Sequence, residues 1–564
     1  YNYFSYRKNN IDKFFSEQLS SLDNNKAVKL KKLITWYFNW SIKHKKIQNL
    51  IQNFIGNIKL VPVGHHLSHA ASAYFSSGFE ESNIIVLDGQ GEQDTITIYD
   101  AKKNNINLIS STSWPYSLGT FYLAATNYLG YRLGDEYKVM GMSAYGKNAY
   151  GKYLEPSFNI AKDGKLEIKE SDYLGFKNIS NTNHLNFTFK EKFKKILEPC
   201  INKNFSQNHF DFAKTIQSIV EDAGVKLSEW SFEKTKKNKI CLSGGVALNG
   251  LMNNKILNLN CFKDAFAYPA SGDDGTSVGS VLYYLSQNKE FELFKRKIIT
   301  CFYGFKEQIN LKKENKIFKN LKIEKTKDTF EFIAKQLHNN KVVAIYNSGS
   351  EFGPRALGAR SILANPSEVN MKEILNEKIK LREPFRPFAP ICLKDKVNEF
   401  FNIKNDSNFM LFICEAKKEK SNLIPSVIHE DNTARVQSVS EENKYFYKIL
   451  KEFYKISNIP VLINTSFNIG GEAIVNSIED AVESFKKMDI DYLLIEDTIF
   501  SKDVTFKKNN ISTEEFINRR KKRFLKKNSF PNIKISYYNS SFYTDFFVFI
   551  KSIIKEKILN KKFV

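Results

Sequence analysis

Two histidines, His65 and His69, stand four residues apart in the segment GHHLSHAASA. On a helix this spacing brings both side chains to one face, and two neutral imidazoles so placed suit a divalent transition metal. Packed histidines satisfied by hydrogen bonds are the alternative, which the spacing alone slightly favours. A zinc-peptidase motif is excluded, because it needs Glu where the chain has His66. A third metal ligand must therefore come from elsewhere.

Two glycine-rich turns follow predicted strands. Residues 83–87 indicate a buried strand that leads through Asp88 and Gly89 into an alternating strand at 95–99. Such a hairpin can hold phosphate with its backbone N–H groups, although an ordinary tight hairpin fits equally. Residues 239–242 predict a strand that runs into Gly244 and Gly245 and then a helix. That arrangement directs N–H groups and the positive helix end at an anionic group.

Two carboxylates lie in a third turn. Asp273 and Asp274 follow the apolar run at 265–268 within the segment SGDDG. They are candidate ligands for a metal or a ribose. Their alternative role is to cap a helix that begins near Thr276.

Arginines are set among glycines and prolines in the second half of the chain. They are Arg355, Arg360, Arg382, Arg386 and Arg435. Rigid loops that present guanidinium groups suit bidentate recognition of phosphate or carboxylate. A structural network of ion pairs is a credible alternative for one or two of the five.

Composition indicates a soluble globular protein with large cores. Of the 564 residues, 42% are hydrophobic and 26% charged, which suits two or three domains. The six cysteines form no CxxC pair, which fits a reducing cytosol and predicts a cytoplasmic protein. The net charge of +23 would suit an anionic partner, but Lys is abundant almost everywhere, so we give it little weight. The sequence shows no signal peptide and no apolar run of membrane-spanning length.

Helical spacing recurs at 30–40, 47–55, 212–230 and 329–337, and a strand is predicted at 342–346. The polar stretch at 155–205 is interpreted as surface insertions. A Lys- and Glu-rich segment places a domain boundary near residue 300. The chain starts at Tyr1 rather than Met, so we expect a fragment or a processed chain.

With its motifs taken in order, the chain resembles the NodU/CmcH-type O-carbamoyltransferases. The resemblance runs from about residue 60 to 500. Its matching blocks are HHLSHAASA, LDGQGE, DEYKVMG, LSGGVALN, SGDDG, EFGPRALGARSIL, KLREPFRPFAP, TARVQ and NTSFN with GGE. Each block alone is weak, but nine in sequence are specific.

The resemblance implies an α/β protein of two modules. Residues 1–300 are expected to be similar to the actin/sugar-kinase (ASKHA) fold, as in tRNA threonylcarbamoyl transferases. Residues 301–502 are expected to form a YrdC-like domain, and 503–564 a basic C-terminal extension outside the resemblance. The family's N-terminal hairpin, with its Asp-containing phosphate loop, would precede Tyr1, and if the chain were the whole protein, the first module would lack an edge of its sheet and one wall of its site. The family also usually has Pro where Ala473 stands.

The implied activity has two steps. The second module would form carbamoyl-adenylate from carbamoyl phosphate and ATP, and the first would move the carbamoyl group to a hydroxyl of a sugar or natural product. The implied cofactors are ATP with Mg²⁺ and a divalent metal, iron(II) in the first place. No nucleic-acid partner is expected, and a homodimer is one compatible assembly.

The resemblance also implies residue roles. The metal would be bound by His65, His69 and Asp273, with Asp274 as the less favoured third ligand. The carbamoyl-adenylate site would be lined by Gly244, Gly245 and Asn249, with Asp88 and Gly89 on the phosphate side. Carbamoyl phosphate and ATP would be held by Lys380, Arg386, Arg355, Arg360, Arg435, Ser466 and Asn468.

Two other functions are compatible with parts of the pattern. A tRNA-modifying threonylcarbamoyl transferase would share the domains and suit the basic charge, but the KLREPFRPFAP block belongs to the carbamoyl family. A nucleotide-binding remnant without transfer activity would follow from the loss of the N-terminal hairpin.

Overall fold

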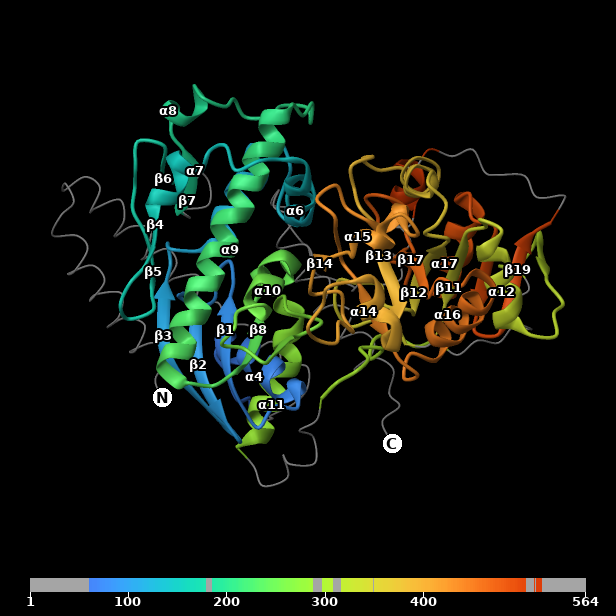
Figure 1. Cartoon of the computed structure of the whole chain (residues 1–564), viewed down its shortest axis with the longest axis horizontal. Helices are drawn as coiled ribbons and strands as arrows, with labels where there is room; N and C mark the ends of the chain where they lie inside the picture. Colours follow the sequence, from blue (N-terminus) through green and yellow to red (C-terminus); the bar gives the residue numbers. More distant parts are fainter. Residues whose placement is uncertain are drawn as a thin grey trace, which may run out of the picture. The chain divides into compact units, whose positions relative to one another are not determined.

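Two large sheets organise the part of the chain that the structure describes. This computed structural model describes residues 60–178, 185–287, 297–307, 316–347, 349–503, 512 and 514–519. The strands of the first sheet all precede residue 268, and those of the second lie between residues 321 and 502 (Figure 1). The molecule is therefore of the mixed α/β class that the sequence predicts.

The first sheet combines an antiparallel hairpin system with parallel strands. Its order is β3 (Asn105–Ser113), β2 (Asp94–Lys102), β1 (Glu81–Leu87), β8 (Lys239–Ser243) and β9 (Asp264–Ala267). The pairs β1–β2 and β2–β3 are antiparallel, whereas β1–β8 and β8–β9 are parallel. The strands predicted at 83–87, 95–99, 239–242 and 265–268 are confirmed, with small shifts of their ends.

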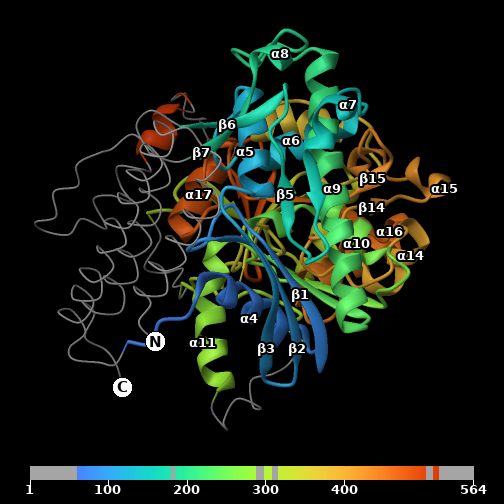
Figure 2. The same ribbon diagram turned by 90° about the vertical axis from the view of Figure 1, so that its left-hand side faces the viewer.

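Helices cover both faces of this sheet (Figure 2). One face carries α4 (His65–Ser77) with α11 (Thr276–Ser286) packed against it, and the other carries α9 (Gln207–Thr235) and α10 (Gly250–Leu257). Both α4 and the helix predicted at 212–230 are therefore confirmed. The helices α4 and α11 approach closely, since a Cβ atom at Gly279 would lie 1.8 Å from the Ser68 carbonyl oxygen.

Parallel pairing brings the predicted motifs together. The strands β1, β8 and β9 run in the same direction, so their carboxyl ends meet at one edge of the sheet. Asp88 follows β1, Gly244 follows β8, and Asp273 follows β9 by a short turn. Ligand sites of open α/β sheets form at this edge.

The part of the chain between β3 and β8 contributes side chains to the hydrophobic core. It contains α5 (Leu118–Tyr128), α6 (Glu136–Met142), α7 (Gly151–Leu154), β4 (Phe158–Ile160), β5 (Leu166–Ile168), β6 (Leu174–Asn178), β7 (Leu185–Phe189) and α8 (Glu191–Lys194). Phe189 and Phe193 are buried, and their ring centroids lie 5.2 and 5.7 Å from that of Phe212 on α9. The interpretation of 155–205 as surface insertions is thus wrong in part, because a few aromatic rings among many polar residues suffice to anchor the segment.

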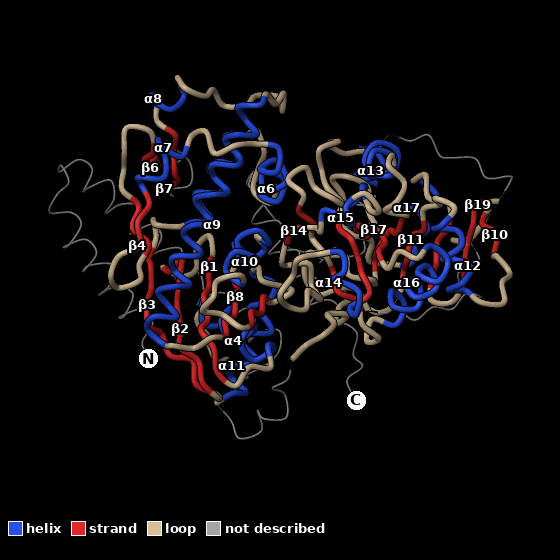
Figure 3. Tube along the Cα trace, in the orientation of Figure 1, coloured by secondary structure: helices blue, strands red, loops and turns tan. Residues whose placement is uncertain are grey.

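The second sheet is mixed and has eight strands. In spatial order they are β10 (Leu321–Ile323), β19 (Thr498–Lys502), β18 (Tyr492–Ile495), β11 (Val343–Tyr346), β12 (Arg360–Ala364), β17 (Val461–Ser466), β13 (Ala389–Leu393) and β16 (Gln437–Val439). Figure 3 shows these strands with α12 (Thr329–His338), α16 (Lys444–Ser457) and α17 (Ile478–Lys487) beside them. The helix predicted at 329–337 and the strand at 342–346 are confirmed.

Some predictions fall outside the described residues. The helical patterns at 30–40 and 47–55 lie there, as does most of the segment 503–564. Within the described ranges, no helix has both the length and the apolar character needed to cross a membrane.

Candidate metal centre and anion site

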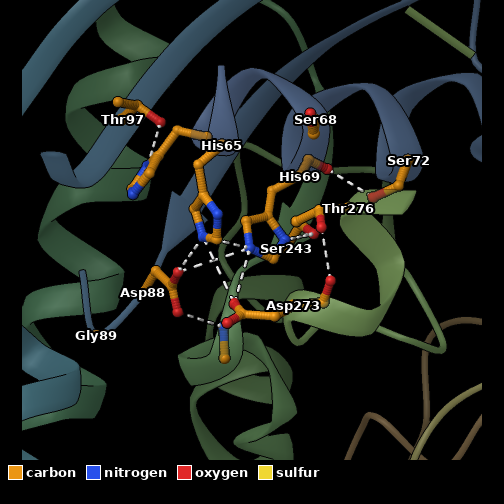
Figure 4. A network of polar contacts seen from close by, with 12 residues as sticks. His65, Ser68, His69, Ser72, Asp88, Gly89, Thr97, Ser243, Asp273 and Thr276 are labelled. Carbon is orange, nitrogen blue, oxygen red and sulfur yellow. Dashed lines mark hydrogen bonds and ion pairs between the residues drawn. The ribbon is translucent and has the colours of Figure 1, made fainter. Parts of the chain in front are cut away.

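The helix α4 presents His65 and His69 together. Their Nε2 atoms lie 3.1 Å apart, and their ring centroids are separated by 4.7 Å (Figure 4). Two ligands that each lie about 2.1 Å from one metal ion, at an angle near 95°, would be about this far apart. The intervening His66 is buried and has a different partner, with its Nδ1 atom 2.9 Å from the Thr97 hydroxyl.

Two carboxylates complete the group. The His65 Nε2 atom lies 2.8 Å from Asp88 Oδ2 and 3.5 Å from Asp273 Oδ1, and the His69 Nε2 atom lies 3.6 and 3.7 Å from the same oxygens. One ligand atom from each of the four residues falls within 4.8 Å of all the others. We call His65, His69, Asp88 and Asp273 the His–Asp cluster. It includes Asp273 and omits Asp274.

The chemistry of the His–Asp cluster fits a divalent metal. Two imidazoles and two carboxylates are a usual ligand set for such ions. Ser243 Oγ lies 3.4 Å from His69 Nδ1, and the backbone N–H of Gly245 donates to Asp88 Oδ1 over 3.1 Å, so groups behind the ligands fix their orientation. The Asp273 side chain is 61% exposed, which leaves the cluster open to solvent.

Charges within the cluster favour a bound cation. Burial lowers the pKa of His69, but hydrogen bonds to Asp273 and Asp88 outweigh it and raise that pKa to about 9. Burial raises the pKa of Asp88, yet hydrogen bonds from His65 and His69 hold it well below its usual range. The proton held by His69 thus balances the ionised Asp88, a role that a metal ion bound to the same residues would take over.

The predicted phosphate-side residues surround Asp88. Gly244 has φ of +88°, and a Cβ atom there would lie 2.2 Å from the Leu87 carbonyl oxygen, so the close approach of β1 and β8 requires glycine. The Ser117 hydroxyl donates to the carbonyl oxygen of Gly89 over 2.7 Å. The structure therefore adds Asp88 to the His–Asp cluster, and its contact with a phosphate, like that of Gly89, Gly244 and Gly245, stays a prediction.

Asn249 is engaged in protein contacts. Its side-chain oxygen caps α10 by accepting from the Met252 N–H, and its amide pairs with that of Gln217 through two 2.9 Å hydrogen bonds. Only 8% of Asn249 is exposed. These contacts hold the turn after β8 in place, and the predicted contact with a ligand remains untested.

A second group, in the loops of the second sheet, consists almost entirely of cations. Arg355, Arg382, Arg386 and Arg435 form what we call the arginine cluster. Burial, together with the charge of Arg386, lowers the pKa of Arg355 to about 10 and that of Arg382 to about 9. Burial also places the pKa of Arg435 well below its usual range, with further lowering from Arg355 and Arg386.

Carboxylate partners are scarce in the arginine cluster. Within the described ranges, the only ion pair of its members joins Arg386 to Glu383 at 3.5 Å. The Nε atom of Arg355 is buried without a hydrogen-bond partner. Like charges brought together without counter-ions are costly, so this arrangement is suited to an anion with several negative charges.

Residues of α6 contact the arginine cluster. The Arg386 guanidinium lies 4.7 Å from the ring centre of Tyr137, Arg435 Nη2 lies 3.8 Å from the sulfur of Met140, and Lys138 pairs with Glu383 at 3.4 Å. The sequence predicts no role for these α6 residues, and it marks Arg382 only as one of five arginines in loops suited to anion recognition. Two sequence features could have pointed to these residues: the block DEYKVMG, and the alternation of Lys380 and Arg382 in KLREPFRPFAP.

Three predicted residues form a compact unit beside the arginines. The Lys380 ammonium donates to Ser466 O at 2.6 Å and Oγ at 3.3 Å, and to Asn468 O at 2.8 Å and Oδ1 at 2.5 Å. Burial, followed by the charges of Arg382 and Arg386, holds the pKa of Lys380 well below its usual range. Because protein oxygens occupy its donors, Lys380 ties the end of η7 (Leu375–Lys380) to the end of β17, and its contact with a ligand stays a prediction.

Arg360 differs from the other arginines. It begins the buried strand β12 rather than lying in a loop, and it is 0% exposed. Its Nη1 atom donates to the carbonyl oxygens of Asn347 and Ala359, and its guanidinium lies 3.7 Å from the ring centre of Tyr346. The loop placement expected for Arg360 is wrong, and these contacts favour a structural role for it.

Comparison with known proteins gives matches over both halves of the chain. The family model described as "Carbamoyltransferase N-terminus" matches residues 5–282, and "Carbamoyltransferase C-terminus" matches residues 334–502. Nodulation protein NolO of Bradyrhizobium diazoefficiens is 32% identical over 443 residues, which cover 77% of this chain and 78% of NolO. An uncharacterized protein of Synechocystis is also 32% identical, over 78% of this chain and 75% of its own length.

A solved structure of full-length HypF in a phosphate- and nucleotide-bound form is 19% identical over 32% of this chain. The match spans 22% of the HypF chain with a TM-score of 0.23, so it carries no argument about the fold. The two family models and the match to NolO are sufficient to assign the family. The chain belongs to the carbamoyltransferase family of the NodU/CmcH type.

Proposed function

We propose that the chain is an ATP-dependent O-carbamoyltransferase with two reaction sites. At the arginine cluster, water cleaves carbamoyl phosphate to carbamate and inorganic phosphate, and a carbamate oxygen then attacks the α-phosphorus of ATP to give carbamoyl-adenylate and release pyrophosphate. The His–Asp cluster then directs transfer of the carbamoyl group to a hydroxyl of a sugar or natural product. In that transfer the acceptor oxygen forms a bond to the carbamoyl carbon, AMP leaves with the electron pair of the broken C–O bond, and the hydroxyl proton is released to water on the open side of the cluster.

We propose a separate fold for each of the two parts of the chain, in keeping with its reaction step. Residues 1–300 would be an ASKHA-type transfer domain, and residues 301–502 a YrdC-like domain that forms the adenylate. Residues 503–564 would be a basic extension outside both. The division is supported by two separate sheets and by two family models whose matches end at residue 282 and begin at residue 334.

The observation that carries the proposal is the charge imbalance of the arginine cluster. Four buried or half-buried guanidinium groups face one carboxylate, Glu383, which Lys138 also neutralises. Carbamoyl phosphate and ATP together supply several negative charges, and their reaction develops further charge on phosphoryl oxygens. Fixed cations stabilise such charge without having to reorganise.

The His–Asp cluster supports the second step. His65, His69, Asp88 and Asp273 would hold a divalent metal, for which we propose iron(II). When bound, the metal would supply Lewis acidity toward the acyl carbonyl. The protein's own contribution is to orient the ligands through Ser243 and Gly245 and to leave one side of the cluster open at Asp273.

Isotope exchange tests the activation step directly. Purified protein given ATP, Mg²⁺, carbamoyl phosphate and labelled pyrophosphate should incorporate label into ATP, and omission of carbamoyl phosphate should abolish the incorporation. The Arg386→Ala variant should lose exchange, whereas Arg132→Ala, which changes an exposed arginine outside the cluster, should not. Absence of exchange with the unchanged protein, or full exchange with Arg386→Ala, would refute the proposal.

A further inference from the structure

His429 lies on a tight turn beside the arginine cluster. The turn leads from η9 (Pro425–Val427) into β15 (Thr433–Ala434). The backbone N–H of His429 donates to the Thr433 carbonyl oxygen over 2.8 Å, and that of Asn432 donates to the His429 carbonyl oxygen over 3.0 Å. These bonds fix the backbone from which the imidazole projects.

A short chain of hydrogen bonds fixes the tautomer of His429. The Thr433 hydroxyl lies 2.7 Å from Asp431 Oδ1 and 3.0 Å from His429 Nδ1. An ionised carboxylate can only accept, so Thr433 uses its one hydroxyl proton on Asp431. Its oxygen must then accept from His429, which places the ring proton on Nδ1. The Nε2 atom of His429 consequently keeps its lone pair.

That lone pair is not engaged by the protein. Across the described parts of the chain, no hydrogen bond to His429 Nε2 is present. Burial, together with the positive charges of Arg435 and Lys372 and only partly offset by Asp431, lowers the pKa of His429 to about 4. The imidazole is therefore neutral near physiological pH and offers a hydrogen-bond acceptor.

The surroundings of this acceptor are cationic donors. Thr433 and Arg435 are two residues apart along an extended segment, so their side chains lie on the same side of it. His429 is bonded to Thr433 and thus lies on the side of Arg435. Lys372, on α13 (Met371–Ile374), completes the surroundings and donates to the Tyr145 hydroxyl over 3.2 Å.

Donors and acceptors recognise different parts of the proposed substrate. Arginine and lysine side chains can only donate, and they match phosphate oxygens and a carbonyl oxygen. The amino group of carbamoyl phosphate donates instead and needs an acceptor. Acetyl phosphate has nearly the same size and charge but carries a methyl group at that position, so an acceptor there distinguishes the two.

We propose that His429 is a specificity-determining residue that accepts a hydrogen bond from the carbamoyl amino group through Nε2. Thr433 and Asp431 are positioning residues that hold the imidazole in the required tautomer. This inference rests on the proposed binding of carbamoyl phosphate in the arginine cluster. It goes beyond that proposal because it explains how a carbamoyl group would be distinguished from another acyl group, which the arginines cannot do.

Two substitutions at one position separate this role from a structural one. The His429→Asn side chain can still donate to Thr433 but has no atom at the Nε2 position. The His429→Gln side chain reaches that position and can offer its carbonyl oxygen there. Both are polar and smaller than or similar to histidine, and their melting temperatures report on folding.

The measurement is pyrophosphate exchange with carbamoyl phosphate as substrate and acetyl phosphate as competitor. For His429→Asn we expect the KM for carbamoyl phosphate to rise about tenfold, the effect of one lost hydrogen bond, with the inhibition constant of acetyl phosphate unchanged. His429→Gln should recover part of the loss, and Thr433→Val should show a smaller rise of KM than His429→Asn.

The outcomes separate this inference from the proposed function. Without carbamoyl phosphate-dependent exchange in the unchanged protein, both are overturned. With exchange present, an equal weakening of carbamoyl and acetyl phosphate in His429→Asn, or no change in either, overturns the role of His429 alone.

Discussion

The His–Asp cluster and the arginine cluster solve opposite electrostatic problems. In the first, two carboxylates and two imidazoles lie within 4.8 Å of one another, and shared protons satisfy them. In the second, four guanidinium groups have one carboxylate partner at 3.5 Å among the described residues. In our proposal a cation would balance the first cluster and an anion the second. The charge of a site's missing partner can thus be inferred from its unsatisfied groups.

The strongest test of this contrast is to weaken the arginine cluster. We expect Arg435→Ala to lower the rate of carbamoyl phosphate-dependent pyrophosphate exchange at least a hundredfold, because a preorganised cation at the developing charge would be lost. The matched control is Arg132→Ala, which should keep the parental rate. An unchanged rate in Arg435→Ala would remove that residue from the activation site.

The His–Asp cluster predicts a loss of metal on substitution. Protein purified with iron(II) or another divalent ion should bind about one equivalent, and His69→Ala should retain less than about a tenth of it, since one of few ligands is removed. Metal content is measured by mass spectrometry after dialysis. The adjacent His66→Asn variant serves as control. Equal metal content in the unchanged protein, His69→Ala and His66→Asn would mean that His65 and His69 are packed histidines and do not bind a metal.

Unpaired arginines should also lower the stability of the unliganded protein. Replacing Arg435 by Met removes a buried charge and keeps most of the side-chain volume. We expect the free energy of unfolding to increase by about 1–2 kcal/mol, with a rise of a few degrees in the melting temperature. Pyrophosphate should stabilise the unchanged protein more than the variant. A lower melting temperature for Arg435→Met would contradict the expectation that repulsion among the arginines destabilises the unliganded protein.

The smallest expected effect concerns pH and His429. Its pKa is lowered to about 4, against an ordinary value of 6.5. Between these values the unfolded chain binds more protons than the folded one, so the free energy of unfolding falls as the pH falls. In His429→Asn this contribution is absent, and chemical denaturation between pH 6.5 and 4 should show a shallower fall. Identical slopes would mean that His429 is not held neutral.

The sequence predicts the elements of both sites better than their contacts. The strand at 83–87 and the strand at 239–242 are visible from their apolar runs, and their parallel pairing explains why Asp88 and Gly244 meet. Nothing in the local pattern indicates that Asp88 approaches His65, because that contact depends on the packing of α4 against the sheet. Residues distant in sequence are joined only by tertiary structure.

The arginines show a second limit of prediction from the sequence. Arg355 and Arg360 share one block, yet Arg355 lies in a loop and is half-buried, while Arg360 stands on the buried strand β12 and donates to backbone carbonyl oxygens. Only four residues lie between the loop arginine and the strand arginine, and no change in the sequence marks the start of β12 at Arg360. Residue type and motif membership alone therefore do not separate ligand-binding from structural arginines.

The division of labour between the two clusters is tested most directly by measuring pyrophosphate exchange in His69→Ala. That variant should lose its metal and the transfer of carbamoyl groups to a hydroxyl acceptor. We predict that its carbamoyl phosphate-dependent exchange stays within about threefold of the parental rate, because activation depends on the arginine cluster. Loss of exchange together with the metal, in a variant that remains folded, would contradict the assignment of the two steps to separate sites.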